Sequence, residues 1–302
     1  MRVVIALGGN AILKRGEPMT AANQRLNVKR AAEAIAKVME AGHEVVITHG
    51  NGPQVGLMAL QDLAYDPALA SPIDCLVAET QGQIGYILQQ ELGNATGNKR
   101  EIVTVLTQIE VDHDDVAFNE PGKPIGPLYS KIEAATVTAK YGWTMMPDGG
   151  SFRRAIASPK PKRIVEIATL KNLLESRVTV ICVGGGGIPI VKYEGGNQLG
   201  IDAVIDKDHA SGLLAREIKA DALLLLTDVD GVYLGWGTDQ QQRLATITPA
   251  ELSADKFAAG SMAPKVQAAI DFASVGNTKT GIGRLEDALE ILNERAGTIV
   301  KI

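Results

Sequence analysis

The sequence is poor in cysteine, with only Cys75 and Cys182 among its 302 residues. The two lie far apart and in apolar stretches, so the chain has neither the CxxC spacing of a metal site nor the cysteines of a disulfide framework. This usage predicts a reducing, cytoplasmic location. The apolar run from Val3 to Leu7 is too short for the core of a signal peptide, and no run reaches the length of a membrane span. We therefore expect no membrane partner.

A surplus of basic charge is also missing. Lys and Arg together number 30 against 35 Asp and Glu, which gives a net charge of −5. Because generic nucleic-acid binding depends on a basic field, nucleic acid is not an expected partner. The composition, 45% hydrophobic and 22% charged, is typical of a globular protein. A chain of this length is sufficient for one large α/β unit or about two domains.

Several catalytic signatures are missing as well. No GxSxG nucleophile elbow and no protein-kinase signature occur. The dinucleotide pattern GxGxxG fails because Pro189 and Ile190 occupy the positions of its last glycine, and the Walker A pattern fails because the pair Gly122–Lys123 is followed by proline. The histidines show no i, i+4 pairing that would indicate a zinc site, so we expect no protein-bound metal; they are His43, His49, His113 and His209.

What the chain does contain is a recurring sequence of an aliphatic run, a glycine cluster and a helical pattern. It occurs at Val3–Ile12, Glu44–Gly56 and Val178–Pro189. Two further aliphatic runs, Ile102–Leu106 and Ala222–Thr227, end in polar residues instead. Near-continuous apolar runs are typical of strands buried on both faces of a parallel sheet.

Helical periodicity separates these strands. We predict helices from about Asn23 to Ala41, from about His209 to Lys219, and from Pro264 onward. The alternation predicts an α/β fold with a doubly wound, mainly parallel sheet, whose ligands bind beyond the carboxyl ends of the strands. Prolines and glycines interrupt the segment from about 113 to 161, which we interpret as a protruding insertion or lid; the alternative is a long structureless connection.

The glycine clusters suggest an anion site. Glycines at strand ends allow backbone N–H groups to approach an anion, and a following helix directs the positive end of its dipole to the same point. For any one cluster a tight turn is the simpler interpretation, but three clusters at one edge of a sheet favour anion binding. His49 adjoins the second cluster, either as a ligand-binding side chain or as a structural histidine.

Two lysines stand where a helix dipole disfavours them. Lys207 and Lys265 fall at predicted helix starts, where a cation is unfavourable by about 0.3–1 kcal/mol unless an anion or a carboxylate compensates. The alternative is an exposed lysine whose stem lies along the surface. Phosphoryl transfer requires such cations, because the protein mainly positions and neutralises the moving group. The stretch Thr227–Tyr233 follows a strand and is either a nucleotide contact or an Asp-Gly turn.

Eight phrases of this chain together resemble the carbamate kinases of the amino-acid kinase fold family. They occur in the same order and spacing over nearly the whole chain: ALGGNAIL, HGNGPQVG, AETQGQIGY, KPIGPLYS, CVGGGGIPI, AVIDKDHAS, LTDVDGVY and SMAPKVQAAI. The resemblance implies a single domain over residues 1–302, a three-layer αβα sandwich with a protruding lid subdomain. It divides the chain into a carbamate- and phosphate-binding lobe, 1–183, with the lid insertion at about 113–161, and a nucleotide-binding lobe, 184–302.

The resemblance also implies the activity, the ligands and the roles of individual residues. The activity is reversible phosphoryl transfer between ATP and carbamate with Mg2+, running from ADP and carbamoyl phosphate to ATP in arginine catabolism, in a homodimer. Lys207 and Lys265 would neutralise the transferring group, Asp208 would hold both lysines, and Lys123 would close over carbamoyl phosphate. Phosphate and carbamate would bind at Gly8, Gly9, Asn10, Gly50, Asn51 and Gly52, and the nucleotide at Thr227, Asp228, Tyr233 and Met262. The alternatives are a kinase of another small acid or phosphonate and a nucleotide-binding homologue without activity.

Overall fold

The fold is built on an eight-stranded central sheet in which only the β16–β17 pair is antiparallel among the described strands. A computed structural model describes residues 1–14, 16–257 and 262–302. The strand order is β15 (Thr246–Ile247), β17 (Thr298–Lys301), β16 (Lys279–Arg284), β12 (Ala222–Thr227), β1 (Arg2–Leu7), β2 (Glu44–His49), β9 (Thr179–Ile181) and β3 (Ile102–Thr104). The mainly parallel sheet predicted from the aliphatic runs is confirmed.

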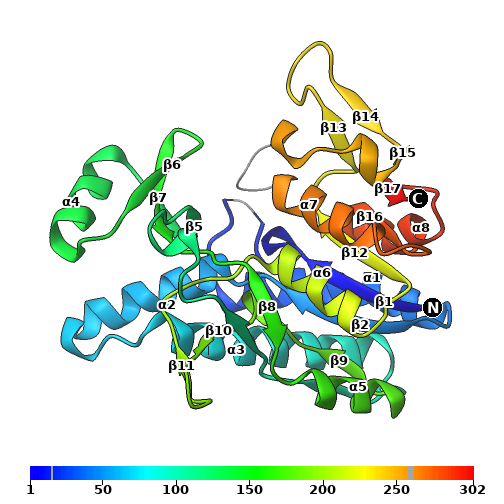
Figure 1. Cartoon of the computed structure of the whole chain (residues 1–302), viewed down its shortest axis with the longest axis horizontal. Helices are drawn as coiled ribbons and strands as arrows, with labels where there is room; N and C mark the ends of the chain where they lie inside the picture. Colours follow the sequence, from blue (N-terminus) through cyan, green and yellow to red (C-terminus); the bar gives the residue numbers. More distant parts are fainter. Residues whose placement is uncertain (15, 258–261) are drawn as a thin grey trace.

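Helices cover both faces of this sheet, so the architecture is a three-layer αβα sandwich (Figure 1). Along β1, Val3 and Ile5 enter a core shared with one set of helices, whereas Val4 enters the core on the other face. Successive side chains of a strand point to opposite faces, which is why a strand buried on both sides must be apolar throughout. The first set is α1 (Ala21–Glu40), α3 (Ile73–Ala95) and α8 (Ala288–Leu292); the second is α5 (Ile167–Glu175), α6 (Lys207–Glu217) and α7 (Met262–Ala273).

The three predicted helices exist, with starts set by their capping residues. The helix α1 begins two residues before the predicted start because the Thr20 hydroxyl accepts a hydrogen bond from the Asn23 N–H (3.2 Å). The helix α6 begins at Lys207, capped by Asp206. The helix α7 begins at Met262 rather than at Pro264. The helical pattern expected after the second glycine cluster is α2 (Gly52–Tyr65), whereas α3 was not predicted.

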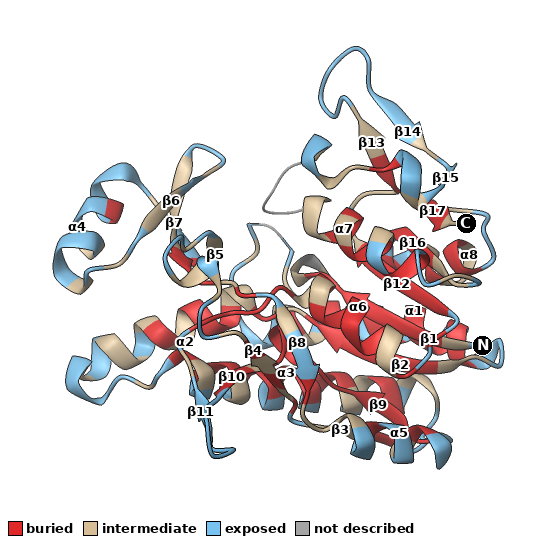
Figure 2. Cartoon of the chain, viewed as in Figure 1, coloured by how far each residue is buried: buried red, intermediate tan, exposed pale blue. Residues whose placement is uncertain are grey.

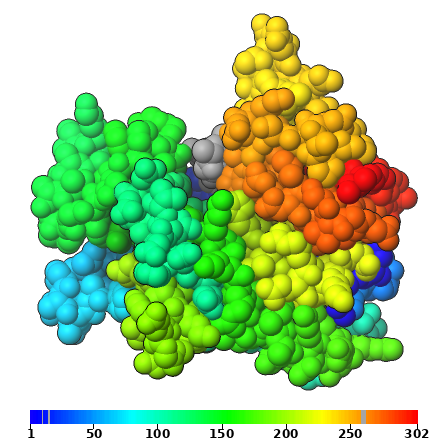
Figure 3. Space-filling model, in the orientation of Figure 1, coloured from blue at the N-terminus to red at the C-terminus, as the bar shows by residue number. Residues whose placement is uncertain are grey.

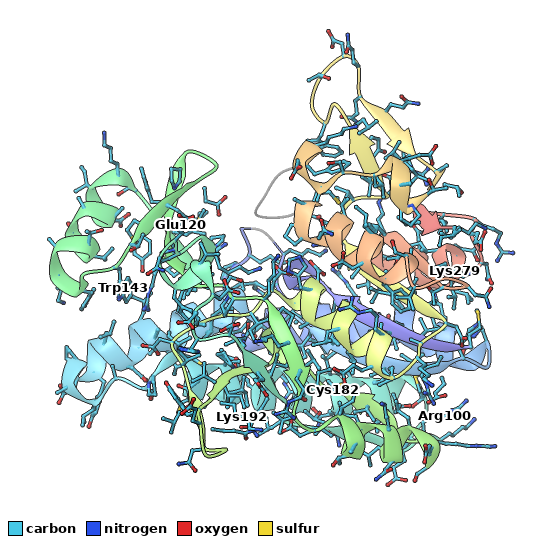
Figure 4. The ribbon with its side chains drawn as sticks, in the orientation of Figure 1. Arg100, Glu120, Trp143, Cys182, Lys192 and Lys279 are labelled. Carbon is cyan, nitrogen blue, oxygen red and sulfur yellow. The ribbon has the colours of Figure 1, made fainter. Side chains whose placement is uncertain are left out.

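A small subdomain stands away from the sandwich and contains most of the predicted lid (Figure 1). Its sheet has the order β5 (Lys123–Tyr129), β7 (Ser151–Ile156) and β6 (Met145–Asp148), accompanied by α4 (Lys131–Tyr141). The guanidinium of Arg154 lies over the ring of Trp143, 4.3 Å from its centroid, and Figure 4 shows Trp143 within this subdomain. Regular structure from 123 to 156 means that the alternative of a structureless connection is wrong for this stretch.

Two smaller sheets and several short helices complete the described chain. One sheet has the order β11 (Gln198–Gly200), β10 (Ile188–Lys192), β4 (Gln108–Val111) and β8 (Pro161–Ile164); the other is the hairpin of β13 (Val232–Leu234) and β14 (Gln242–Leu244). The 3-10 helices are η1 (Gly9–Ala11), η2 (Pro67–Leu69), η3 (Val116–Phe118), η4 (Gly184–Gly186), η5 (Pro249–Glu251), η6 (Ala254–Lys256) and η7 (Leu285–Asp287). Burial is concentrated in the central sheet and the adjoining helix faces, and the lid subdomain is mostly exposed or intermediate (Figure 2). Within the described residues, no helix combines the length and apolar character that a membrane span requires.

Candidate functional site

The carboxyl ends of three adjacent strands meet at one edge of the central sheet. The strand β1 lies between β2 and β12, and the chain leaves β1 at Gly8 and β2 at Gly50. The Gly8 N–H donates to the carbonyl of Leu226 (3.1 Å), and the Gly50 N–H donates to the carbonyl of Leu7 (3.1 Å). A Cβ on Gly8 would lie 2.9 Å from the Leu226 oxygen, so this close approach requires glycine. The first two predicted glycine loops therefore lie side by side.

A cleft of about 810 Å³ opens above these strand ends. Figure 3 shows the surface hollowed between the lid subdomain and the part of the chain that carries the β13–β14 hairpin. The predicted site residues that line the cleft are Gly8, Gly9, Gly50, Asn51, Gly52, Lys123, Lys207, Asp208, Thr227, Asp228, Tyr233, Met262 and Lys265. Asn10 lies in η1 beside them, but its side chain falls outside the described part of the structure.

Asp208 contacts the two predicted catalytic lysines at once. One carboxylate oxygen accepts a hydrogen bond from Lys207 Nζ, and the other accepts from Lys265 Nζ at 3.1 Å. The two lysines come from the first turns of α6 and α7, which pack side by side, and Asp208 is only 3% exposed. The carboxylate that compensates a cation at these helix starts is thus Asp208, and an exposed lysine is wrong for both positions.

Burial and charge pairing act in opposite directions on these three groups. Burial opposes ionisation of Asp208, but the ammonium groups of Lys207 and Lys265 outweigh it and hold the Asp208 pKa below its ordinary value. Burial lowers the pKa of Lys207 despite the carboxylate beside it. For Lys265, burial also acts to lower the pKa, but Asp208 more than compensates and the pKa lies above its ordinary value. Lys265 is therefore the more firmly charged of the two cations.

Lys123 reaches the same cleft from the base of the lid. Its ammonium group, on the first residue of β5, forms an ion pair with Asp206, the capping residue of α6. The other oxygen of Asp206 accepts from the Asp208 N–H at 2.8 Å. Burial raises the pKa of Asp206, but the charge of Lys123 outweighs it, and the pKa falls below the usual range. Asp206 was missed as a site residue, although an Asp directly before a predicted helix start is a recognisable capping signal.

The residues predicted to bind the nucleotide lie near the end of β12. The Thr227 hydroxyl donates to Asp228 (3.1 Å), and the Tyr233 hydroxyl donates to Asp230 (2.8 Å). The ring of Trp236 meets that of Tyr233 edge-on at 5.2 Å, and Trp236 also lines the cleft. The stretch Thr227–Tyr233 therefore connects β12 to β13 and forms a wall of the cleft. Trp236, Phe257 and Arg153 also line the cleft but were not predicted, since no spacing in the sequence marks them.

The third glycine cluster differs from the other two. Gly184 and Gly186 are buried and do not line the cleft, so an anion-binding role is wrong for them. A Cβ on Gly184 would lie 2.5 Å from Nε2 of His49, and one on Gly186 would lie 2.2 Å from the carbonyl of Ile205. Only Gly185 of η4 faces the cleft. The cluster is therefore glycine-rich because neighbouring groups pack against its backbone.

His49 is a structural histidine. It is 1% exposed, lies outside the cleft lining, and places Nδ1 3.1 Å from the carbonyl of Gly50. Burial, opposed only in part by this hydrogen bond, lowers the pKa of His49 to about 4. The ring is consequently neutral near pH 7 and donates its Nδ1–H to the carbonyl of Gly50.

Comparisons with known proteins agree with this geometry. The model of the amino acid kinase family matches residues 1–283. Carbamate kinases from Rhizobium meliloti and Haemophilus influenzae are 50% and 51% identical to this chain over 99% of its length, and the matches cover 93% and 96% of those proteins. A carbamate kinase structure from Giardia lamblia bound to citric acid superposes with a TM-score of 0.94 at 40% identity, covering 99% of this chain and 98% of that one. Another structure of the Giardia lamblia enzyme, bound to AMP-PNP, has a TM-score of 0.90 at 40% identity with the same coverage.

Proposed function

The chain belongs to the amino acid kinase family and groups with its carbamate kinases, and from this premise we propose that it transfers a phosphoryl group reversibly between ATP and carbamate. In one direction a carbamate oxygen bonds to the γ-phosphorus of ATP while the bond from that phosphorus to the ADP oxygen breaks. In the other, ADP takes the phosphoryl group from carbamoyl phosphate, and we assign this direction to arginine catabolism. The observation that carries the proposal is the buried Lys207–Asp208–Lys265 cluster beside two glycine loops.

Charge neutralisation is the main chemical task of this cluster. The transition state of phosphoryl transfer spreads negative charge over the equatorial phosphate oxygens, and fixed cations in a water-poor site stabilise it most strongly. Lys207 and Lys265 supply two cations, and Asp208 holds them at neighbouring positions against their mutual repulsion. No nucleophile from the protein is required, because the substrate oxygen attacks phosphorus directly.

We assign the two sides of the cleft to the two substrates. Residues 1–183, with the lid insertion at about 113–161, form the carbamate and phosphate lobe, and residues 184–302 form the nucleotide lobe. The glycine loops would hold the transferring phosphate and carbamate through Gly8, Gly9, Asn10, Gly50, Asn51 and Gly52. The walls beyond β12 would hold the nucleotide through Thr227, Asp228, Tyr233 and Met262; these latter four lie together in the cleft.

Lys123 connects the lid to the transferring group. In the structure its ammonium group is paired with Asp206. We propose that the phosphate of carbamoyl phosphate takes the place of Asp206 as its partner when the substrate binds, so that the lid closes over the substrate. The lysine is 27% exposed through its side chain, which leaves it accessible to a ligand in the cleft.

Magnesium would enter as part of the nucleotide substrate. The buried carboxylates of Asp206 and Asp208 are each paired with lysine, so phosphate oxygens and water are the expected ligands of the ion.

We further propose a homodimer in a reducing cytoplasm. Cys75 and Cys182 are both free, and Cys182 is buried in the body of the sandwich (Figure 4), in keeping with such a compartment.

The test is ATP formation by the purified protein from ADP, magnesium and carbamoyl phosphate. We expect activity in the wild type and a loss of about 10²–10³-fold or more in turnover for Lys265→Ala, since the lost cation acts in the transition state. Lys171→Ala, which removes an exposed lysine from α5, is the matched control and should retain full activity. A folded wild type that binds ADP but makes no ATP would overturn the proposal in favour of another small acid substrate or an inactive homologue.

A further inference from the structure

The side-chain amide of Asn51 donates a hydrogen bond to a buried threonine that lies outside the cleft. Asn51 is 2% exposed, and its Nδ2 lies 2.7 Å from Oγ1 of Thr80, a residue of α3 that is fully buried. Thr80 does not line the cleft, so it cannot touch a substrate there. The contact therefore connects a cleft residue to a side chain in the layer behind it.

The hydrogen bonds of Thr80 determine which way the Asn51 amide points. A hydroxyl group carries one proton, and that of Thr80 lies within reach of the carbonyls of Leu76 (3.0 Å) and Val77 (2.9 Å) in its own helix. With its proton used in this way, the Thr80 oxygen is an acceptor toward Asn51, and the NH2 group of the amide must face it. The opposite orientation would bring two oxygens together unless the hydroxyl gave up both helix carbonyls.

Gly185 prevents the amide from leaving this orientation by moving sideways. A Cβ on Gly185 would lie 2.2 Å from Nδ2 and 2.5 Å from Oδ1 of Asn51, so the glycine backbone packs directly against the amide. Gly185 has φ +64°, a conformation that favours glycine. The amide of Asn51 is thus fixed at one edge by Thr80 and on one side by Gly185.

This arrangement leaves Oδ1 as the polar atom that Asn51 presents to the cleft. Within the described part of the chain, no group donates a hydrogen bond to it, and Asn51 is one of the residues that line the cleft. An oxygen acceptor is poorly suited to a phosphate, whose oxygens need donors such as the neighbouring lysines and backbone N–H groups. It is well suited to an NH2 group, which is the part of carbamoyl phosphate that carries protons to donate.

We propose that Thr80 is a positioning residue that directs the Asn51 carbonyl oxygen to the amino group of carbamate and carbamoyl phosphate, and so makes the site specific for a carbamoyl over an acetyl group. The inference rests on the proposed function. Acetyl phosphate has a methyl group in place of NH2, so its binding would leave Oδ1 desolvated without a partner. Sites built to hydrogen-bond a substrate group reject analogues that lack it far more strongly than apolar pockets reject a size change.

The experiment compares wild type, Thr80→Val and Thr80→Ser in ATP formation from carbamoyl phosphate and from acetyl phosphate. Valine keeps the shape of threonine and removes the acceptor, whereas serine retains it. We expect the wild type and Thr80→Ser to prefer carbamoyl phosphate in kcat/KM, and Thr80→Val to reduce that preference about tenfold or more, through carbamoyl phosphate and with KM for ADP unchanged. Thermal unfolding confirms that each variant is folded.

A binding measurement on the wild type does not depend on any variant folding. Phosphonoacetamide and acetonylphosphonate are unreactive analogues that differ only in NH2 against CH3, and we expect the first to bind about tenfold or more tightly. Equal binding of the two, or an unchanged preference in folded Thr80→Val, overturns the role of Thr80 and leaves the phosphotransferase function standing. A wild type that forms no ATP from either acyl phosphate overturns the proposed function and this inference together.

Discussion

His49 makes the stability of this protein depend on pH between about 6.5 and 4. The ordinary pKa of histidine, 6.5, applies in the unfolded chain, whereas burial lowers it to about 4 in the folded protein. Between these values the unfolded state binds a proton that the folded state does not, so acidification favours unfolding. The free energy of unfolding should therefore fall as the pH decreases from 6.5 to 4. One pKa unit corresponds to about 1.4 kcal/mol, so the total loss is about 3 kcal/mol.

Urea unfolding of the wild type and His49→Gln, at several pH values from 7.5 to 5, measures this contribution. The glutamine variant should be less stable at pH 7.5, because it loses the packing of the ring, but its stability should depend less on pH. At pH 5 the difference between the two dependences should reach about 2 kcal/mol. The pKa values of Asp206 and Asp208 are lowered from an ordinary value of 3.8, so these two carboxylates lose their stabilising ionisation below this range.

The matched control is Gln198→Ala, which removes an exposed side chain that does not titrate from β11. It should preserve the slope of the wild type between pH 6.5 and 5. If His49→Gln also preserved that slope, the ring would be protonated equally in both states, and the argument from burial would be refuted.

Four further substitutions test the site and the lid. Lys123→Ala should raise the KM for carbamoyl phosphate about tenfold or more with little effect on ADP, and equal effects on both substrates would contradict its placement in the lid. Asp208→Asn leaves two buried ammonium groups without their shared carboxylate and should lower the free energy of unfolding by about 3–5 kcal/mol in chemical denaturation; an unchanged value would show that the cluster is not held by this charge. Gly56→Ala places a Cβ 2.0 Å from the backbone of Gly126 at the lid base and should destabilise by about 1–3 kcal/mol. Gly82→Ala, in open space on α3, should instead stabilise by about 0.5–1 kcal/mol, and similar effects of both alanines would refute the tight contact.

The central sheet was predictable because its strands are apolar on both faces, and the unpredicted elements depart from that simple pattern. The strand β16 contains Gly281 and Gly283, which resemble a turn in the sequence. A Cβ on Gly281 would lie 2.2 Å from Cγ2 of Ile291, so these glycines allow α8 to pack closely on the sheet. The strand β5 contains Pro124 and Pro127, which a strand tolerates only at a sheet edge, and β5 is indeed an edge strand of the lid.

Two lysines of the candidate site were predictable because each stands at a helix start, where the helix dipole disfavours a cation. Lysines at helix starts oppose the helix dipole, and the structure resolves that conflict through the carboxylate of Asp208. The ion pair of Lys123 with Asp206 joins residues 83 positions apart, and no local signal connects them. The position of Trp236 depends likewise on how a hairpin folds over the cleft, which is a property of tertiary structure.

The continuity of the central sheet restricts how the two substrates can approach each other. The glycine loops proposed to hold the acceptor follow β1 and β2, and the residues proposed to hold the nucleotide follow β12, so neighbouring hydrogen-bonded strands of a single sheet carry both. Adjacent strands are about 4.8 Å apart, and a sheet resists changes in this spacing because every backbone hydrogen bond would have to stretch. With the substrates bound as proposed, the sheet backbone sets the distance between the donor and acceptor sites, and this distance need not be created in each catalytic cycle by rotation of one lobe against the other. Exchange of substrates would then require motion only of the lid and the loops above the sheet.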